Sequence, residues 1–486
     1  MTQLRYATSV ASFLKGTEAM IVLAPQNVLR AKRHPAVDAL PKELAKLTRD
    51  LASDTAAGLN GSAAGTLTGS SPRKLAVGVL PNTVSRHNSP SRTESIRAQM
   101  AASSTGRRGK AGAIVILDDP AHLAGALSGI ARALPVYSAK TAKKSPASLQ
   151  LLALDAKGKV VKISKAVRAH LEAMREAGRL VDTPPTEMNP AEMQKEAYAM
   201  VRGLANVTKK SIVGPKLLEA GCGGIHAVGR TALSPPRLVI LTYSPKGAKK
   251  HIALVGKGVT YDTGGLSIKV GGGMVNMKSD MGGSAAVLGA FRSLAEGGCK
   301  HKVSALLCLA ENAIGPDAFK NDDILHMHSG KTVEINNTDA EGRLVLGDGV
   351  SYAARKLKAD VVIDAATLTG AQLVATGRQV AAVVTDDEKL EAILTTAGRQ
   401  VGDLCHPLVY NPEFHRKEFA SKVADMRNSV SDRMNAQSSC AGAFVHWHLD
   451  GTKVRWAHVD LAGPAFVAGR ATGFGVGLLA EAVRAI

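Results

Sequence analysis

Short apolar runs separated by turn-forming stretches recur along the front of the chain. Four of them are typical of buried strands: AMIVLAP (19–25), KLAVGVLP (74–81), GAIVILDD (112–119) and LQLLALD (149–155). LRYATSV (4–10) predicts a further strand, although the first 17 residues, basic and rich in Ser and Thr, would also suit a mitochondrial transit peptide. The small, polar stretch 56–74 predicts a surface loop or hairpin. Strands alternating with helical stretches predict an α/β domain here.

Helical periodicity replaces this pattern between Val167 and Val181. Apolar residues recur there at helical spacing until the sequence DTPP stops them. We therefore expect a basic N-terminal α/β domain over residues 1–163, a connecting helix over 164–182 and a larger C-terminal domain over 183–486.

The second half of the chain repeats the alternation with longer apolar runs. Five buried-type strands are expected: RLVILTYS (237–244), HIALVGKG (251–258), VSALLCLAE (303–311), ADVVIDAA (359–366) and QVAAVVTD (379–386). The stretches 284–297 and 347–358 between them have helical character. The fold class is therefore α/β, with a central C-terminal sheet flanked by helices, and ligands of such sheets bind beyond the carboxyl ends of the strands.

Composition narrows the class of protein. The 486 residues are 45% hydrophobic and 21% charged, as in ordinary globular proteins, and no apolar run reaches membrane-spanning length. An aromatic content of 3% disfavours stacking platforms for single-stranded nucleic acid. Five scattered cysteines without a CxxC motif indicate a reducing compartment. We expect a cytoplasmic protein, with a mitochondrial location as the alternative.

The net charge of +20 is unevenly distributed. Residues 1–182 hold 27 lysines and arginines against 12 acidic residues, whereas residues 183–486 hold 34 against 29. A basic front half could bind nucleic acid, an anionic surface or an acidic partner. A merely solvated basic surface explains the same numbers.

Several familiar motifs fail on their context. SGKT (329–332) lacks the earlier glycine of a phosphate-binding loop and runs into a predicted strand, VEI. A single DTG (262–264) cannot form the paired aspartates of an aspartic protease. The histidines of HMH (326–328) and HWH (446–448) fit surface or core positions better than metal ligation.

One constellation of charged residues does not fail. Glycine-rich turns of the predicted C-terminal sheet carry four carboxylates and three cations: Lys257, Asp262, Lys269, Asp280, Asp339, Glu341 and Arg343. In NNTDAEGRLVLGDG (336–349), the last three would share one face of an extended segment, or Thr338 or Asp339 would cap a helix with Glu341 in its first turn. Crowded carboxylates raise one another's pKa, so this cluster favours two divalent ions, with zinc, manganese, cobalt or magnesium equally suitable.

The segments VGKGVTYDTGGLSIK, MKSDMGGSAA and NTDAEGRLVLGDG resemble the signatures of the leucyl aminopeptidase (cytosol aminopeptidase) family of two-metal exopeptidases. Their spacings agree with that family, and the resemblance extends from about residue 165 to the end through DTPPTEMNP, ATLTGA and HVDLAGPAF. The front half is similar to the family's variable N-terminal domain only in position and α/β character.

The resemblance implies a metal-dependent aminopeptidase with residues 183–486 as the catalytic domain. One metal ion would be held by Lys257, Asp262, Asp280 and Glu341, and the other by Asp262, Asp339 and Glu341. Since only a neutral amine can coordinate a metal, the pKa of Lys257 would have to be depressed by two adjacent cations and burial. Two zinc, manganese or cobalt ions per subunit are implied.

The same resemblance assigns the remaining roles. Lys269 would stabilise the oxyanion, and Arg343 would hold a bicarbonate that acts as general base. A pocket for Leu- or Met-like first side chains would be lined by Met277, Thr367, Gly370, Ala462 and Ala465, although core packing explains the two alanines nearly as well. The implied partners are peptides with a free N-terminus and further copies of the chain in a homohexamer.

The basic front half keeps a different function open, that of a nucleic-acid-binding protein with or without peptidase activity. A steep fall of DNA affinity with salt would distinguish it. A metal-binding scaffold without turnover is a third hypothesis, which the intact Lys269 and Arg343 disfavour.

Overall fold

The computed structural model describes residues 2–141 and 146–486, which form two compact units. Unit 1 comprises residues 1–171 and 398–404, and unit 2 comprises residues 172–397 and 405–486. The helix α7 (Lys165–Asp182) runs from one unit into the other. Across the described ranges, no helix combines the length and apolarity needed to cross a membrane.

Unit 1 is built on a six-stranded sheet in the order β1-β6-β5-β2-β4-β3, and only the β3–β4 pair is antiparallel. Its strands are β1 (Thr2–Tyr6), β2 (Ala19–Pro25), β3 (Ser62–Leu67), β4 (Lys74–Leu80), β5 (Gly109–Ile116) and β6 (Ala147–Leu154). The five strands predicted in the front half are therefore confirmed. The stretch 56–74 contains β3, an edge strand whose residues are all half-buried or exposed and which forms a hairpin with β4.

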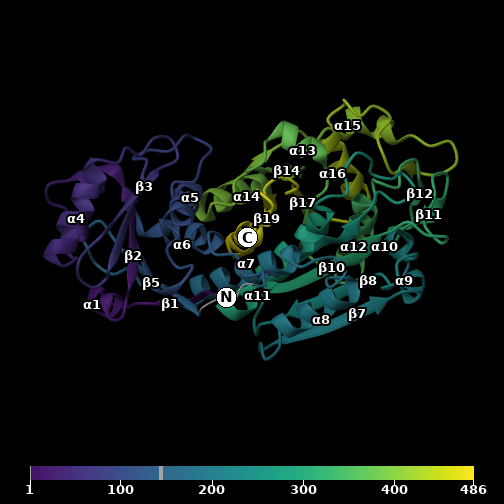
Figure 1. Cartoon of the computed structure of the whole chain (residues 1–486). Helices are drawn as coiled ribbons and strands as arrows, with labels where there is room; N and C mark the ends of the chain where they lie inside the picture. The colour runs from purple at the N-terminus through teal and green to yellow at the C-terminus, as the bar shows by residue number, and fades with distance from the viewer. Residues whose placement is uncertain (1, 142–145) are drawn as a thin grey trace. The chain divides into compact units, whose positions relative to one another are not determined.

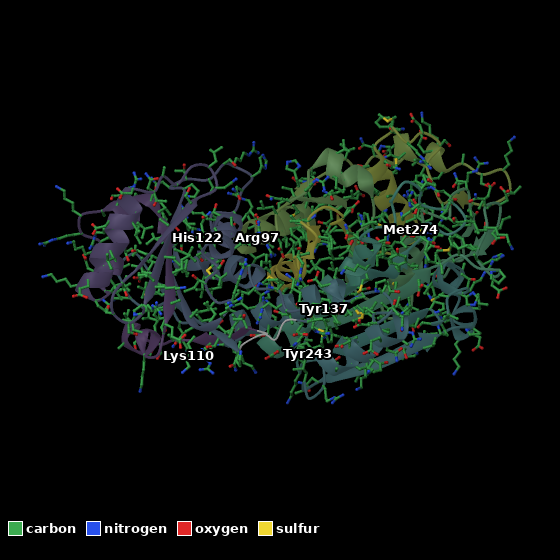
Figure 2. All side chains as sticks on the ribbon, viewed as in Figure 1. Arg97, Lys110, His122, Tyr137, Tyr243 and Met274 are labelled. Carbon is green, nitrogen blue, oxygen red and sulfur yellow. The ribbon has the colours of Figure 1, made fainter. Side chains whose placement is uncertain are left out.

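Helices cover both faces of the unit 1 sheet, with α4 on one face and α5 and α6 on the other (Figure 1). The helices are α1 (Val10–Leu14), α2 (Gln26–Arg30), α3 (Pro35–Asp38), α4 (Lys42–Ser53), α5 (Thr93–Ser103), η1 (Pro120–His122) and α6 (Leu123–Arg132). Many basic side chains of this unit, among them Arg97 and Lys110 in Figure 2, are at least partly exposed.

Unit 2 contains an eight-stranded mixed sheet in the order β15-β14-β17-β13-β9-β10-β8-β7. Its strands are β7 (Val207–Val213), β8 (Arg237–Tyr243), β9 (His251–Asp262), β10 (Lys302–Asn312), β13 (Val361–Ala366), β14 (Ala381–Thr385), β15 (Cys405–Pro407) and β17 (Arg455–Asp460). The central strands β17, β13, β9 and β10 are mutually parallel. Their carboxyl ends consequently meet at one edge of the sheet.

The helices of unit 2 lie on both faces of this sheet: α10, α12 and α16 on one, α11 and α17 on the other. They are α8 (Pro190–Met200), α9 (Lys216–Glu219), α10 (Gly223–Gly229), η2 (Met277–Met281), α11 (Gly282–Gly297), α12 (Gly342–Arg355), α13 (Gly370–Ala375), α14 (Glu388–Val401), α15 (Pro412–His415), η3 (Arg416–Phe419), α16 (Gln437–Trp447) and α17 (Val476–Ala485). The last residues of α14, from 398 onward, belong to unit 1. Short strands form two small sheets, β11 (Ile324–His326) with β12 (Thr332–Glu334) and β16 (Met426–Arg427), and β18 (Phe466–Val467) with β19 (Arg470–Ala471).

The predicted fold class is confirmed, and each of the five long apolar runs of the second half is a strand. The long, continuous apolar character of β9 and β10 follows from their central position, where both sheet faces are covered by helices. The strand predicted after SGKT is β12. Neither β7 nor β17 was predicted from the apolar pattern, because β7 is largely polar and β17 mixes charged and apolar residues.

Candidate metal centre

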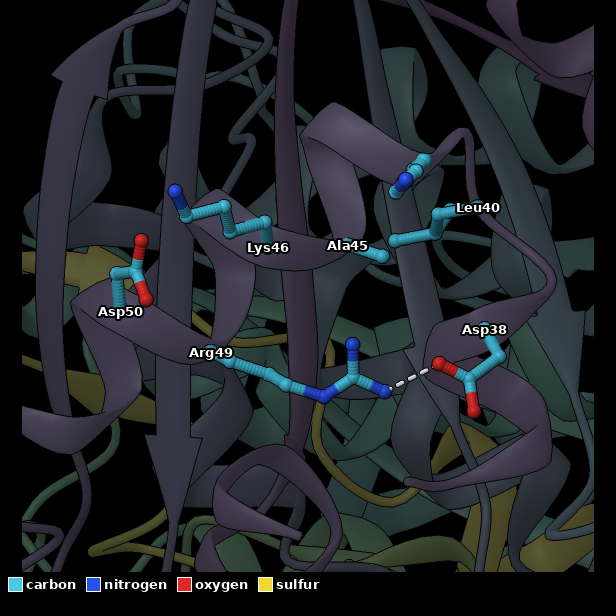
Figure 3. Close-up of a pocket in the computed structure, with 7 residues that line it drawn as sticks. Asp38, Leu40, Ala45, Lys46, Arg49 and Asp50 are labelled. Atoms are coloured by element: carbon cyan, nitrogen blue, oxygen red, sulfur yellow. Dashed lines mark hydrogen bonds and ion pairs between the residues drawn. The ribbon is translucent and has the colours of Figure 1, made fainter. Parts of the chain in front are cut away.

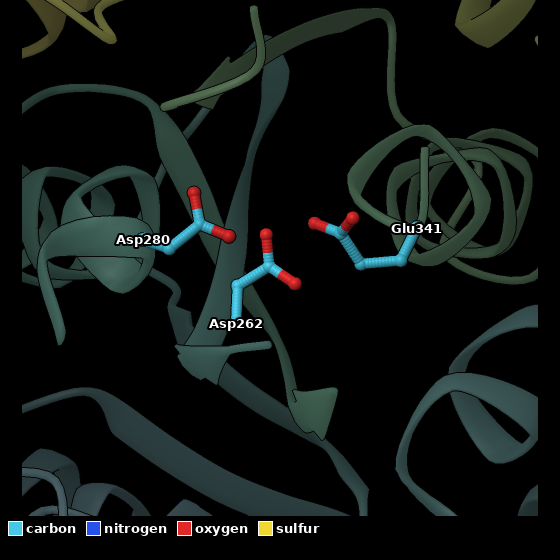
Figure 4. A group of neighbouring side chains, drawn as sticks. All are labelled: Asp262, Asp280 and Glu341. Carbon is cyan, nitrogen blue, oxygen red and sulfur yellow. The ribbon is translucent and has the colours of Figure 1, made fainter. Parts of the chain in front are cut away.

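Charged side chains collect at the carboxyl edge of the parallel strands. Asp262 ends β9, Asp280 lies in η2 just before α11, and Glu341 lies at the N-cap of α12. One carboxylate oxygen from each of the three lies within 4.8 Å of the others, and all three residues are buried (Figure 4). Within the described residues this is the group that could hold a metal ion.

The motif around Glu341 is neither a straight strand nor a helix capped by Thr338 or Asp339. Residues 336–341 turn into α12, whose N-cap is Glu341, and its side chain makes no capping hydrogen bond. The carboxylate is therefore free to face the cluster. The next residue, Gly342, has no room for a side chain, because a Cβ atom there would lie 2.7 Å from three side-chain atoms of Lys257.

Two buried or half-buried lysines bridge the carboxylates. The Lys257 Nζ lies 2.8 Å from Asp280 Oδ2 and 2.9 Å from Glu341 Oε1, and it donates to the Thr367 carbonyl at 3.0 Å. The Lys269 Nζ lies 2.9 Å from Asp262 Oδ2 and 2.5 Å from Asp339 Oδ1. The structure therefore brings together all five residues expected as metal ligands, with Lys269 beside two of them.

The electrostatics of the cluster fit a divalent cation. Burial raises the pKa of Asp280, Glu341 and Asp339, and neighbouring carboxylates add to the shift of each, whereas the lysines oppose it. Asp280 Oδ2 and Asp339 Oδ1, which face the ammonium groups of Lys257 and Lys269, have no further hydrogen-bond partner within the described chain. Carboxylate oxygens with unused lone pairs are the ligands that hard divalent ions require.

Without metal ions, Lys257 does not have the lowered pKa that a metal-ligating amine requires. Burial by itself would lower its pKa, but the carboxylates of Asp280 and Glu341, together with Asp262, outweigh burial and raise the pKa. The expected depression therefore depends on divalent ions that neutralise these carboxylates, since burial does not produce it.

Arg343 is the second residue of α12 and is 5% exposed. Burial lowers the pKa of its guanidinium to about 10, against the opposing effect of Glu341. Its Nε and Nη1 atoms are buried and have no hydrogen-bond partner within the described residues. A buried guanidinium with unused donors is suited to an anion, and bidentate groups such as carboxylates or bicarbonate match its fork.

The expected pocket residues are only partly brought together. Thr367 donates to Asp280 Oδ1 at 2.9 Å, and Met277 lies in η2 with Asp280. Thr367 and Ala465 would both contact a Cβ atom placed on Gly282, at 3.1 and 3.2 Å. Gly370 begins α13 and is exposed, and Ala462 is half-buried. Whether these five residues line one specificity pocket stays a prediction.

Other features of unit 2 explain residues that did not look functional. His448 is fully buried and its Nδ1 pairs with Ser329, while the Nδ1 of His328 pairs with Ser351. These pairings agree with the expectation of core histidines. The backbone carbonyl of Met274, which is labelled in Figure 2, accepts a hydrogen bond from the Tyr261 hydroxyl at 3.3 Å. This bond connects the loop after Lys269 to β9.

Unit 1 offers a cavity of a different kind. A depression of about 450 Å³ lies over α3 and α4 and is lined by Asp38, Leu40, Lys42, Ala45, Lys46, Arg49 and Asp50 (Figure 3). The Arg49 guanidinium pairs with Asp38 across it. Its three basic side chains outnumber its two aspartates, so the depression lacks the excess of negative charge of the cluster in unit 2.

Two positions escaped the sequence analysis although they lie at the same sheet edge. Asn312 ends β10 and donates to Asp262, and Asp460 ends β17 and accepts hydrogen bonds from Leu368, Thr369 and Ala462. Both residues are fully buried. The rule that polar residues ending parallel strands build sites would have found Asn312, whereas β17 itself was not predicted.

Buried carboxylates at the carboxyl edge of a parallel sheet, with two lysines among them, form a group that suits divalent metal ions. Comparison with known proteins identifies the class of protein to which this site belongs. Residues 175–480 match the cytosol aminopeptidase family, catalytic domain, and residues 18–143 match the M17 aminopeptidase N-terminal domain 2.

Individual relatives agree. A probable aminopeptidase of Mus musculus is 47% identical over 412 residues, which cover 83% of this chain and 78% of the relative. Leucine aminopeptidase 1 of Caenorhabditis elegans is 47% identical over 310 residues, 63% of each chain. The solved apo structure of leucyl aminopeptidase from Trypanosoma cruzi superposes with a TM-score of 0.91 at 37% identity and covers 99% of this chain and 97% of its own.

The chain belongs to the cytosol aminopeptidase family, and it is a metal-dependent aminopeptidase, a hydrolase that acts at peptide N-termini. The family resemblance predicted from the sequence is confirmed. Nucleic-acid binding through the basic front half, the alternative function, finds no support in these comparisons.

Proposed function

We propose that this enzyme hydrolyses the N-terminal peptide bond of peptides whose first side chain is apolar and Leu- or Met-like. The observation that carries the proposal is the group of Asp262, Asp280 and Glu341 within 4.8 Å, with Asp339 joined to it through Lys269. One metal position would be held by Lys257, Asp262, Asp280 and Glu341. The other would be held by Asp262, Asp339 and Glu341. When bound, two divalent ions supply a water of lowered pKa and polarise the scissile carbonyl.

The residues of the chain divide the remaining work. Lys269 lies beside Asp262 and Asp339, the ligands of the second position, and its ammonium group stabilises the oxyanion that forms on the substrate carbonyl. Arg343 would hold a bicarbonate through its unpartnered Nε and Nη1, and a bicarbonate bound there would supply a general base. Thr367 orients Asp280 through its hydroxyl and Lys257 through its carbonyl.

Substrate preference is proposed to depend on Met277, Thr367, Gly370, Ala462 and Ala465. Their small or flexible side chains would leave room for Leu or Met. Structures of leucyl aminopeptidase from Trypanosoma brucei were solved in complex with actinonin and with bestatin, and we expect both compounds to inhibit this enzyme.

The remaining proposals concern organisation. We propose residues 1–163 as a variable N-terminal domain, 164–182 as a connecting helix and 183–486 as the catalytic domain. A homohexamer in the cytoplasm, with zinc, manganese or cobalt as the metal, follows from the family resemblance and is open to direct measurement of mass, location and metal content.

The test is hydrolysis of leucine amide by the pure protein. The protein is stripped with chelator and then supplied with Zn²⁺, Mn²⁺ or Co²⁺ in the presence and absence of bicarbonate. We expect metal to restore activity, bicarbonate to increase it, and Glu341→Ala to lower it by about a thousandfold or more, the scale seen for essential catalytic groups.

The matched control is Glu296→Ala, which removes a partly exposed glutamate of α11 that pairs with Arg292 at 3.6 Å. It should retain full activity. A folded, metal-loaded wild type without activity toward leucine amide or other N-terminal amides would overturn the proposal, and equal rates with leucine, glycine and aspartate amides would overturn the preference.

A further inference from the structure

Asn312 is a buried amide placed directly against the metal centre. It ends β10 and is in register with Asp262, which ends the adjacent parallel strand β9. Its exposed fraction is 0%, so every hydrogen bond that its side chain makes is shielded from water. Leaving a buried amide imperfectly satisfied is costly, so its retention at this point needs a reason.

Both donors of the Asn312 amide are used on the centre. The Nδ2 atom donates to Asp262 Oδ1 at 2.8 Å and to the Thr338 carbonyl at 3.1 Å. Two acceptors on one side decide which way the amide faces, because the reversed amide would place its oxygen against both. Its own Oδ1 accepts no hydrogen bond from the described residues. The side chain therefore acts as a donor only.

The hydrogen bond from Asn312 restricts the orientation of the Asp262 carboxylate. Its Oδ1 accepts from Asn312 and also from the Gly264 amide at 2.9 Å, so protein donors occupy that oxygen. Its Oδ2 is turned the other way and lies 2.9 Å from Lys269 Nζ. Asp262 thus presents a single oxygen to the centre, and the carboxylate cannot rotate without breaking two hydrogen bonds.

The second donor reaches the loop that carries the other ligands. Thr338, whose carbonyl Asn312 holds, precedes Asp339 and is fully buried. Its hydroxyl donates to the Gly264 carbonyl at 2.6 Å and accepts from the Ser267 amide at 2.7 Å. The Asn312 amide therefore links the end of β9 to the loop of Asp339 and Glu341, and the Thr338 hydroxyl links that loop to the turn leading to Lys269.

We propose that Asn312 is a positioning residue of the metal centre, which fixes Asp262 as a one-oxygen ligand and aligns it with the Asp339 loop. This inference rests on the proposed two-metal function. Asn312 does not touch substrate. Its effect acts through the geometry of Asp262, and removal of such a hydrogen-bonding partner of a ligand typically weakens metal binding 10- to 100-fold.

The test measures metal binding and not only activity. Metal-free wild type, Asn312→Leu and Asn312→Asp are titrated with Co²⁺ against a competing chelator, and the visible absorption of bound Co²⁺ is recorded. Leucine conserves the side-chain shape but has no hydrogen-bond donor. Aspartate replaces the donor nitrogen with an oxygen, which would face the Asp262 carboxylate. We expect each variant to bind Co²⁺ at least tenfold more weakly, with an altered absorption spectrum.

Two controls separate the possible causes. Gln99→Met removes a buried amide of unit 1 that donates to the Asn60 carbonyl at 2.9 Å, and it should bind Co²⁺ within twofold of the wild type. Glu341→Ala removes a proposed ligand and should lose the bound ions. Circular dichroism and thermal unfolding of the metal-free proteins identify any variant that fails to fold, and Asn312→Asp provides the result if Asn312→Leu does not fold.

The outcomes are distinguishable. If Asn312 only fills space, Asn312→Leu binds Co²⁺ within threefold of the wild type and gives its spectrum, and that result overturns the inference while leaving the proposed function intact. If the wild type itself binds no Co²⁺, or Glu341→Ala binds it normally, the proposed function fails and the inference fails with it.

Discussion

The two units share an α/β architecture but differ in how far their buried charged groups are paired with partners of the chain. In unit 1, the buried Arg92 uses each guanidinium nitrogen, donating to the carbonyls of Pro81, Asn82 and Pro90 and pairing with Asp118 at 2.8 Å. In unit 2, four carboxylates face only two lysines, and Asp280 Oδ2 and Asp339 Oδ1 have no partner besides those ammonium groups within the described chain.

This difference distinguishes charged groups that stabilise the fold from charged groups that are suited to bind a ligand. A buried cation whose donors are all used stabilises its surroundings and leaves nothing to bind. A buried excess of negative charge destabilises the chain unless a cation joins it. The net charge of +20 therefore does not locate the site, which is locally acidic although the protein is basic.

Among the variants that compare the two units, Lys269→Met in unit 2 should have the largest effect. Since this removes the ammonium group that we propose to stabilise the oxyanion, kcat should fall about 10²- to 10³-fold. Metal affinity should not weaken, because a cation competing for Asp262 and Asp339 is lost. The measurement is kcat for leucine amide together with bound metal per subunit. Lys302→Met, at the opposite end of β10, is the control, and a kcat within threefold of wild type for Lys269→Met would contradict the assignment.

In unit 1 the comparison predicts a loss of stability without a loss of chemistry. Arg92→Met leaves the carbonyls of Pro81, Asn82 and Pro90 and the partly exposed Asp118 without their donor, so the free energy of unfolding should fall by about 2 kcal/mol. Turnover per folded molecule should stay within twofold. Urea unfolding and kcat on the same samples test both statements.

The control for Arg92 comes from the same helix. Arg97 pairs with Glu94 at 2.5 Å, and both side chains are about one third or more exposed (34% and 43%). Arg97→Met should therefore cost less than about 1 kcal/mol. Equal losses for the two arginines would show that burial does not distinguish them.

The smallest predicted effect concerns pH. Burial lowers the pKa of His448 to about 3, whereas an unfolded histidine titrates near 6.5. The unfolded state therefore binds the proton first as pH falls, and stability is lost below about pH 6.5. Between pH 7 and 5.5, wild type should lose about 1 kcal/mol more than His448→Gln.

Urea unfolding of the metal-free protein at both pH values measures this difference. His326→Gln, which alters an exposed histidine, should follow the wild type. Identical pH dependence for wild type and His448→Gln would show that His448 is not held neutral in the folded unit 2.

Much of the fold could be predicted from local pattern. β2, β4, β9, β10 and β13 are continuous apolar runs bounded by turns, and such runs have few alternatives to a buried strand. The residues of the metal centre followed from glycine-rich turns after these strands, combined with the family motifs. The missed strands, β7 and β17, lack a clear pattern, because β7 lies at a sheet edge and β17 carries the buried charges His458 and Asp460.

The amino-acid sequence by itself determined which elements form, which carboxylates and lysines are available, and the family to which the chain belongs. Only the tertiary structure decided how these groups meet. Asn312 and Asp262 are 50 residues apart, Thr338 and Gly264 are 74 apart, and Thr369 and Asp460 are 91 apart. Such hydrogen bonds form only after parallel strands have aligned their carboxyl ends, and no local pattern encodes which strands become neighbours.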